Sequence, residues 1–281
     1  MRRLITLSAA TAASALFLAG CGAGGGSDAE VGQESEEGVT TLTVGVSPVP
    51  HGTILEFVNE NLAEEAGLSL EIVSYDDYAL PNRALVDGEL DANYFQHLPY
   101  FESESESQGY ELAHFDGVHI EPFALYSNEY DDVADLPDGA QIGINNDPSN
   151  QGRALDLLAE AGLITLDDSV DVVSATVGDV VDNPKNLEFI EADAASLART
   201  LDDVDASVIN GNYAIEAGLS PTEDGLLVES GEDNPYANFL AVRAGDETNE
   251  AIVTLDELLH SEEVRQFIEE TWADGAVIPA F

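Results

Sequence analysis

The sequence predicts an α/β protein whose sheets are mainly parallel, and three observations lead to that prediction. Hydrophobic residues make up 44% of the 281 residues, so the chain can bury at least one substantial core. Short runs that alternate as strands are followed repeatedly by runs with helical spacing. Proline opens and glycine closes several of the helical runs. Such alternation is typical of parallel sheets with right-handed crossovers, which bind ligands at the carboxyl ends of their strands.

The elements can be placed along the chain by their spacing and by their end signals. A first strand is predicted at 42–46, where apolar residues alternate, and the helix that follows it from Ile54 ends at Gly67. Further along, Pro81 opens a short helix, and Ser261 is suited to cap the last one. The other predicted elements are strands at 68–72, 142–144, 187–190 and 206–209, a helix that ends at Gly162, and helices at 194–201, 213–217 and 252–259.

Two extended apolar segments, at 121–126 and 236–242, interrupt this alternation and bracket the middle of the chain. If both cross between domains, the two ends of the chain form one lobe and the middle forms another. The alternative is that both are ordinary central strands of a single sheet, which periodicity cannot distinguish. The length suits two domains, so we expect lobe 1 at 41–122 with 240–281, and lobe 2 at 123–239.

The charge balance excludes several classes of partner. Eight lysines and arginines stand against 56 aspartates and glutamates, which gives a formal net charge of −48. Binding to nucleic acid needs a basic face that releases counterions, and binding to anionic lipid by charge needs the same. Neither is predicted. The acidity instead suggests a protein kept soluble by self-repulsion, as halophilic proteins are.

The first twenty residues have the pattern of a secretory signal. Two arginines precede an apolar stretch at 4–18, which is shorter than the ~20 residues that a membrane span needs. Leu-Ala-Gly then precedes Cys21, the single cysteine, as in a lipobox. A lone cysteine is usually a buried thiol, but this position favours lipidation. We predict a signal peptide at 1–20, lipidation of Cys21, a flexible tether at 21–40, and a protein anchored at the extracytoplasmic face of the cell membrane.

The residues available for catalysis do not form a known motif, and no enzymatic activity or cofactor is predicted. The sequence lacks a G-x-S-x-G elbow, an H-E-x-x-H motif and a phosphate-binding P-loop. With 56 acidic residues, some carboxylates lie close together by chance, so a hydrolase built on such a pair has no specific support. His114 and His119 could meet acidic neighbours at a zinc or manganese ion, which keeps a metal-ion receptor as the alternative function.

A polar loop at 146–153 lies between the strand at 142–144 and a helix. Free N–H groups at a helix N-terminus attract anions, and we expect Arg153 in the first turn of this helix. A cation there is mildly unfavourable by itself. A bound carboxylate would explain it, since a guanidinium accepts a carboxylate bidentately. The alternative is that Arg153 pairs with one of the chain's many acids.

Aromatic residues gather at 75–100, although they make up only 7% of the chain. Five of them lie here among asparagine, glutamine and histidine residues. This mixture is typical of a small pocket with an apolar floor and a few hydrogen bonds. An aromatic core cluster is the alternative, but Gln96, His97 and Pro99 would fit poorly in a closed core.

With these features, the chain resembles the methionine-binding lipoproteins of ABC importers, the NlpA-type substrate-binding family. The resemblance covers 41–281 and agrees with the lipobox at Cys21. The residues that carry it occur in the family's order, and they are the blocks Val46 to Gly52, Asp77 to Leu85, Asp91 to Tyr100, Asn146 to Arg153, Asn183 to Leu187, Ile209-Asn210 and Asn234 to Asn238.

The resemblance implies a periplasmic-binding-protein type-2-like fold, with two α/β lobes, two crossover strands and the ligand in the cleft. It also implies delivery of L-methionine, D-methionine or a close derivative to an ABC permease with a separate ATPase subunit. Arg153 would take the methionine carboxylate, while Asn210 and Asn238 would hydrogen-bond its amino and carboxylate groups. The thioether side chain would contact Tyr78, Phe95, His97 and Tyr100, because sulfur packs favourably against aromatic rings.

Overall fold

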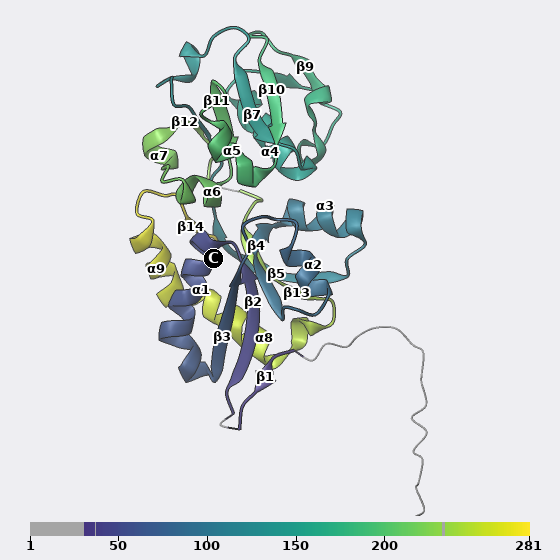
Figure 1. Cartoon of the computed structure of the whole chain (residues 1–281), viewed down its shortest axis with the longest axis vertical. Helices are drawn as coiled ribbons and strands as arrows, with labels where there is room; N and C mark the ends of the chain where they lie inside the picture. Colours follow the sequence, from purple (N-terminus) through teal and green to yellow (C-terminus); the bar gives the residue numbers. More distant parts are fainter. Residues whose placement is uncertain (1–30, 37, 232–233) are drawn as a thin grey trace, which may run out of the picture.

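The computed structural model describes residues 31–36, 38–231 and 234–281, which form two lobes stacked along the long axis (Figure 1). The lower lobe (lobe 1) contains the purple and yellow ends of the described chain, and the upper lobe (lobe 2) contains the teal and green middle. The predicted signal peptide, Cys21 and the first part of the predicted tether lie outside the described residues. Among the residues that are described, no helix is both long and apolar enough to cross a membrane.

Lobe 1 is built on a mixed sheet. Its strands β3, β2 and β4 run parallel, whereas β13 is antiparallel to both of its neighbours, β4 and β5. Along the sheet the order is β1-β2-β4-β13-β5-β14, and β3 also pairs with β2. The strand bounds are β1 Gln33–Glu34, β2 Thr40–Val46, β3 Leu68–Ser74, β4 Ala92–His97, β5 Leu112–Ile120, β13 Asn238–Arg243 and β14 Ile278–Pro279.

Five α-helices belong to the described part of lobe 1. α1, α8 and α9 pack together beside β2 and β3, where the rings of Phe57 and Phe267 stack 4.2 Å apart (Figure 1). The first predicted helix is regular only in its first part, since turns of other helical types continue it to Gly67, whose φ is 73°. The bounds are α1 Thr53–Val58, α2 Pro81–Val86, α3 Leu98–Gln108, α8 Glu250–Leu259 and α9 Glu262–Thr271.

Lobe 2 contains a second mixed sheet of order β10-β7-β11-β6-β12. β7 is parallel to β10 and β11, and β6 is antiparallel to β11 and β12. The prediction of mainly parallel sheets therefore holds around β2 and β7 but fails at β13 and β6. The bounds are β6 Ala124–Tyr126, β7 Gln141–Asn145, β10 Glu188–Ala192, β11 Ala206–Ile209 and β12 Gly225–Val228, with a separate pair β8 Thr165–Leu166 and β9 Val180–Asp182.

The longest helix of lobe 2, α4 (Pro148–Glu160), follows β7 directly and presents one apolar face to the sheet. Leu155 and Leu158 are fully buried against Ile142 and Ile144 of β7. On another side, α4 touches the 3₁₀ turn at Val172–Ser174 so closely that only glycine fits at Gly152. The remaining helices are α5 Ala194–Thr200, α6 Gly211–Glu216 and α7 Pro221–Asp224.

Two connections between the lobes can be followed in the described residues: 121–123 lies between β5 and β6, and 229–231 with 234–237 lies between β12 and β13. Of the predicted crossover at 236–242, residues from Asn238 onward pair within the lobe 1 sheet as β13. The expected boundary after residue 239 therefore falls inside a strand. The crossover ends at Asn238 because β13 pairs there with β4 and β5, and such long-range pairing cannot be read from local sequence.

The predicted tether is too long at its carboxyl end. Gln33 and Glu34 form β1 and pair with Thr41 and Thr40 of β2, so the sheet begins before residue 40. The backbone N–H of Gly32 also donates to the carboxylate of Asp91 (3.0 Å). This polar stretch lacks apolar periodicity, and its order comes from an edge-strand pairing that local composition does not reveal.

Candidate functional site

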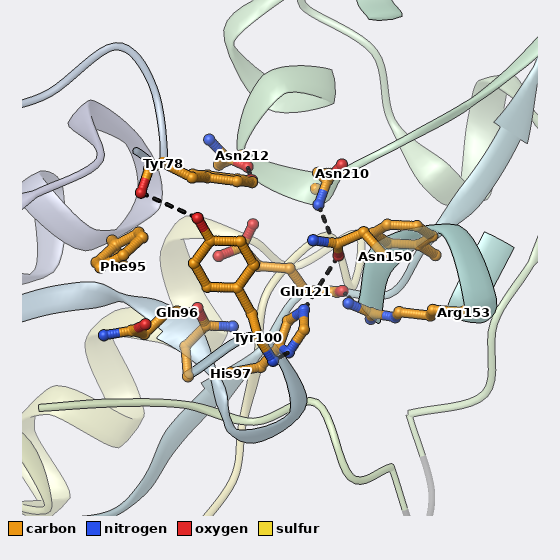
Figure 2. Close-up of a pocket in the computed structure, with 13 residues that line it drawn as sticks. Tyr78, Phe95, Gln96, His97, Tyr100, Glu121, Asn150, Arg153, Asn210 and Asn212 are labelled. Atoms are coloured by element: carbon orange, nitrogen blue, oxygen red, sulfur yellow. Dashed lines mark hydrogen bonds between the residues drawn. The ribbon is translucent and has the colours of Figure 1, made fainter. Parts of the chain in front are cut away.

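A pocket lies between the lobes, lined by residues from both of them and from the two connecting segments. Figure 2 shows its side chains converging from opposite sides. All the residues predicted from sequence for the ligand site line this one pocket, so the structure brings that set together. The lining consists of Tyr78, Phe95, Gln96, His97, Tyr100, Glu121, Phe123, Asn150, Arg153, Asn210, Gly211, Asn212 and Asn238.

The expected loop at 146–153 is helical from Pro148 onward, because Asp147 caps α4 by accepting from the N–H of Asn150 (3.0 Å). Arg153 therefore reaches the pocket from the second turn of α4 and not from the first. The side chain of Arg153 is 4% exposed. Its guanidinium lies between the rings of Phe123 and Tyr236, and the guanidinium carbon is 4.1 Å from each ring centroid. Phe123 belongs to one connecting segment and Tyr236 to the other. This cation therefore lies where both connections pass.

The guanidinium has an internal acid partner, Glu229. Nε donates to Oε1 of Glu229 (2.9 Å), and Nη2 donates to Oε2 (2.5 Å) and to the backbone oxygen of Glu121 (3.0 Å). Burial alone would raise the pKa of Glu229, but Arg153 holds it below its ordinary value. Pairing with an acid, the alternative to a carboxylate ligand, is thus present. Nη1 takes no part in these three hydrogen bonds.

Aromatic rings form one wall of the pocket. The ring centroids of Tyr78, Phe95 and Tyr100 lie 5.7–6.0 Å from one another. The Tyr100 hydroxyl donates to the backbone oxygen of Tyr78 (3.1 Å), and the Tyr78 hydroxyl donates across the cleft to Oδ1 of Asn212 (2.5 Å). Burial raises the pKa of Tyr78 well above its usual value, so both hydroxyls remain neutral donors.

A chain of hydrogen bonds that joins His97, Asn150 and Asn210 crosses the cleft beside this wall (Figure 2). Nδ1 of His97 accepts the Tyr100 N–H at the start of α3, so Nε2 carries the proton and donates to Oδ1 of Asn150 (3.1 Å). Nδ2 of Asn210 donates to the same oxygen (3.2 Å). Burial, helped by Arg153, lowers the pKa of His97 to about 3, so this histidine is neutral at pH 7.

Glu121 is the acidic residue of the pocket, and the sequence analysis missed it. It is 6% exposed, and its Oε1 accepts from Nε2 of His119 (2.9 Å) and lies 3.3 Å from Nε2 of His51. Burial raises its pKa, against the lowering effect of His51, Arg153 and the Asn212 N–H. A single acid in the apolar segment 120–126 was the available signal.

Other pocket residues were also missed: Gln96, Phe123, Asn150, Gly211 and Asn212. Gln96 was expected to fit poorly in a closed core, yet its side chain is buried. Its amide exchanges hydrogen bonds with Asn82, which also accepts from Asn93. These amides satisfy one another behind the pocket floor, as buried polar groups require.

The predicted pairing of His114 with His119 is not found. His114 is exposed and packs against Phe101 and Phe239. It precedes His119 by five positions on β5, which places the two histidines on opposite faces of the sheet. His119 instead lies with His51 and Glu121, and within the described part of the chain these three offer ligand atoms within 4.8 Å of one another. The hydrogen bonds of His119 to Glu121 and of His51 to Asn238 account for that approach.

The site therefore offers a buried guanidinium, a buried carboxylate, several neutral amides and an aromatic wall. Opposite charges held a short distance apart suit a small zwitterion, and the wall suits an apolar side chain. A carboxylate of the ligand would meet Arg153, and an ammonium would meet Glu121. These are the groups of an α-amino acid.

Comparison with known proteins identifies the relatives of this chain. Residues 42–281 match the family model for NlpA lipoprotein. The chain is 44% identical over 265 residues to the methionine-binding lipoprotein MetQ of Bacillus subtilis, covering 93% of each protein.

Two similar solved structures are a nutrient-binding protein from Burkholderia cenocepacia bound to methionine and a periplasmic substrate-binding protein of an ABC transporter from Coxiella burnetii. Each is 40% identical, with TM-scores of 0.82 and 0.81, and the match covers 85% of this chain and 100% of the other. The predicted type-2-like fold of two lobes is confirmed, whereas the metal-receptor alternative gains no support from these relatives. The chain belongs to the NlpA lipoprotein family.

Proposed function

We propose that this chain is the substrate-binding protein of an ABC importer and that its ligand is methionine. The observation that carries the proposal is the meeting of Arg153, Glu121 and the aromatic wall in one pocket between two lobes. The relative from Bacillus subtilis is named for methionine binding, and the Burkholderia cenocepacia structure holds methionine. Both L- and D-methionine present the same charged groups and the same thioether.

In this proposal each pocket residue has a role that its chemistry fits. Nη1 of Arg153 takes the methionine carboxylate, and the amides of Asn210 and Asn238 bond to its amino and carboxylate groups. Glu121 accepts from the ammonium. The thioether packs against the rings of Tyr78, Phe95, His97 and Tyr100, which suits a polarizable sulfur that accepts hydrogen bonds weakly.

The proposed partners follow from the same assignment. The chain, anchored through lipid on Cys21 at the extracytoplasmic face of the cell membrane, passes its ligand to a permease. A separate ATPase subunit supplies the energy, and this chain performs no catalysis of its own.

Direct hydrogen bonds already join the two lobes. They include the bond from the Tyr78 hydroxyl to Asn212 and the bond from the Tyr213 hydroxyl to the backbone oxygen of Asp76 (3.1 Å).

Thermal unfolding of the purified chain tests the ligand. The protein is first refolded from denaturant, so that methionine carried through purification is removed. Methionine at a hundredfold excess over its Kd should raise the free energy of unfolding by about 2.7 kcal/mol, because it binds only the folded state. Other amino acids, zinc and manganese form the control set. Stabilisation by a metal and by no amino acid would contradict the proposal.

Replacing Tyr78 by phenylalanine tests the bond between the lobes. The variant loses the hydroxyl that donates to Asn212 but keeps the ring, so we expect methionine affinity to fall roughly 3- to 10-fold, for a hydrogen bond worth about 0.5–1.5 kcal/mol. Calorimetric titration measures the change. Tyr130→Phe is the matched control, because its hydroxyl bonds to Asp205 within lobe 2. Equal affinities for Tyr78→Phe and the parent would show that this bond does not favour the bound form.

A further inference from the structure

Behind Glu121, on the side of lobe 1, lies a buried histidine pair that the proposed ligand does not reach. His51 lies in the turn at Pro48–Gly52 and His119 on β5, and their side chains are 1% and 0% exposed. Their rings meet edge to face with centroids 4.8 Å apart, and the ring of Tyr94 meets both. Packing therefore fixes the direction in which each imidazole points.

The hydrogen bonds assign a proton to one nitrogen of each ring. Nδ1 of His119 accepts from the Tyr94 hydroxyl, so Nε2 carries the proton and donates to Oε1 of Glu121 (2.9 Å). Nε2 of His51 faces two acceptors, Oδ1 of Asn238 (3.1 Å) and Oε1 of Glu121 (3.3 Å), so it too carries the proton. The His119 N–H thus points at the Glu121 carboxylate, whereas the His51 N–H bonds to Asn238 and lies close to the same carboxylate oxygen.

Both histidines are neutral donors at pH 7. Burial lowers the pKa of His51 to about 4 and that of His119 to about 3. The neutral N–H of His119 bonds to the ionised form of Glu121 and so opposes the burial that raises the pKa of this carboxyl, without adding a positive charge. A lysine or arginine in the same place would form an ion pair and compete with the ligand's ammonium.

The arrangement has a structural cost that argues for a role beyond packing. Nδ1 of His51 is buried and has no hydrogen-bond partner within the described residues. An unpartnered buried polar atom destabilises the fold, and an apolar side chain of similar size would avoid this. The imidazole provides what an apolar side chain lacks, an N–H that bonds to Asn238 and lies close to the Glu121 carboxylate.

We propose that His51 and His119 are positioning residues that hold the Glu121 carboxylate as the acceptor for the ligand's α-ammonium. They thereby set the preference for an α-amino acid over the same molecule without its amino group. The inference rests on the proposed function and extends it to two residues that line no part of the pocket. It also gives a role to the block Val46 to Gly52, which the roles assigned above leave without one.

The test compares methionine with 4-(methylthio)butanoate, which keeps the carboxylate and the thioether but has no amino group. Calorimetric titration of the purified full chain gives the ratio of the two affinities. We expect the parent to prefer methionine by about 30-fold or more, as for a buried charged pair. His119→Leu should lower this ratio by roughly tenfold, the effect of one hydrogen bond to a charged group. His51→Leu should lower it by a smaller factor, because the His51 N–H bonds to Asn238 and only lies near the carboxylate.

The ratio separates positioning from a merely structural role, because a general loss of packing weakens both ligands equally. His119→Gln supplies an amide N–H near the position of Nε2 and should restore much of the ratio. It also keeps the test decisive if the leucine variant does not fold. His260→Leu is the matched control, since His260 bonds to Asp256 and Gly117 and should leave the ratio unchanged.

Unchanged ratios in both leucine variants, with methionine still preferred by the parent, would overturn this inference alone. A parent that binds neither ligand would instead overturn the proposed function. The titration of the parent is repeated in EDTA, where we expect the same ratio. A ratio that changes with EDTA would show that a metal ion, and not the two N–H groups, holds the carboxylate.

Discussion

Arg153→Ala is expected to lower methionine affinity by about 30-fold to several thousandfold, which corresponds to roughly 2–5 kcal/mol for a buried charged hydrogen bond. The guanidinium is 4% exposed, and it is the cation that lines the pocket. Without it, the ligand carboxylate would be buried with amides alone. Calorimetric titration of the folded variant measures the loss.

The same substitution also removes the partner of Glu229, so stability has to be measured separately. Glu229 is largely buried and its pKa is held down by Arg153, so alanine leaves a carboxylate without its cation. We expect a lower melting temperature in the ligand-free variant. Arg199→Ala, at an exposed arginine of α5, is the control and should change neither quantity. Parent-like affinity for methionine in Arg153→Ala would make Arg153 a structural partner of Glu229 and disprove its carboxylate role.

Gly152→Ala is expected to lower the free energy of unfolding by at least about 2 kcal/mol, the range for overpacking a filled space. A Cβ on Gly152 would lie 2.0 Å from the backbone oxygen of Val172, so one backbone segment has to move. Alanine is the better helix former, but that preference offsets only about 1 kcal/mol. The steric effect therefore decides the sign, and the melting temperature should fall by roughly 5–10 °C.

Gly178→Ala is the matched control for this second variant. Gly178 lies in a 3₁₀ turn of the same lobe, where an added Cβ would meet its nearest neighbour, Oγ1 of Thr176, at an ordinary 3.4 Å. We expect a change within about 0.5 kcal/mol, as at other unconstrained positions. A Gly152→Ala variant as stable as the control would mean that α4 and the turn at Val172–Ser174 separate easily.

Elements with a clear period and a terminal signal were predicted from sequence, and the others were not. β2 alternates, and α9 follows Ser261, whose hydroxyl accepts the Val264 N–H (3.3 Å). The helix α4 was also predicted, but it begins at Pro148, inside the stretch that was expected to be a loop. β4 is buried along its whole length, so it has no alternation to detect. α3 carries a run of alternating serine and glutamate with no apolar face beyond its first turn.

The candidate site was predicted as far as single residues stood out by type. Arg153 was conspicuous because the chain has few cations, and the aromatic residues because they cluster. Glu121 was not conspicuous, because a chain with 56 acids gives no reason to single out one of them. His51 was not conspicuous either, because it is one of five histidines without ligand spacing. Their importance depends on a meeting between residues that lie 70 positions apart in sequence, which the sheet and the crossover bring about.

The position of Arg153 between Phe123 and Tyr236 has a thermodynamic consequence. Any rotation that separates the lobes must turn about the two connecting segments, and each contributes one of these rings. A group that neutralises the guanidinium from the pocket changes the energy of its contact with both rings at once. The equilibrium between the rotated and unrotated lobes is therefore coupled to the binding of an anionic group at Arg153. By reciprocity, binding shifts the rotation by the same free energy by which rotation changes the binding affinity.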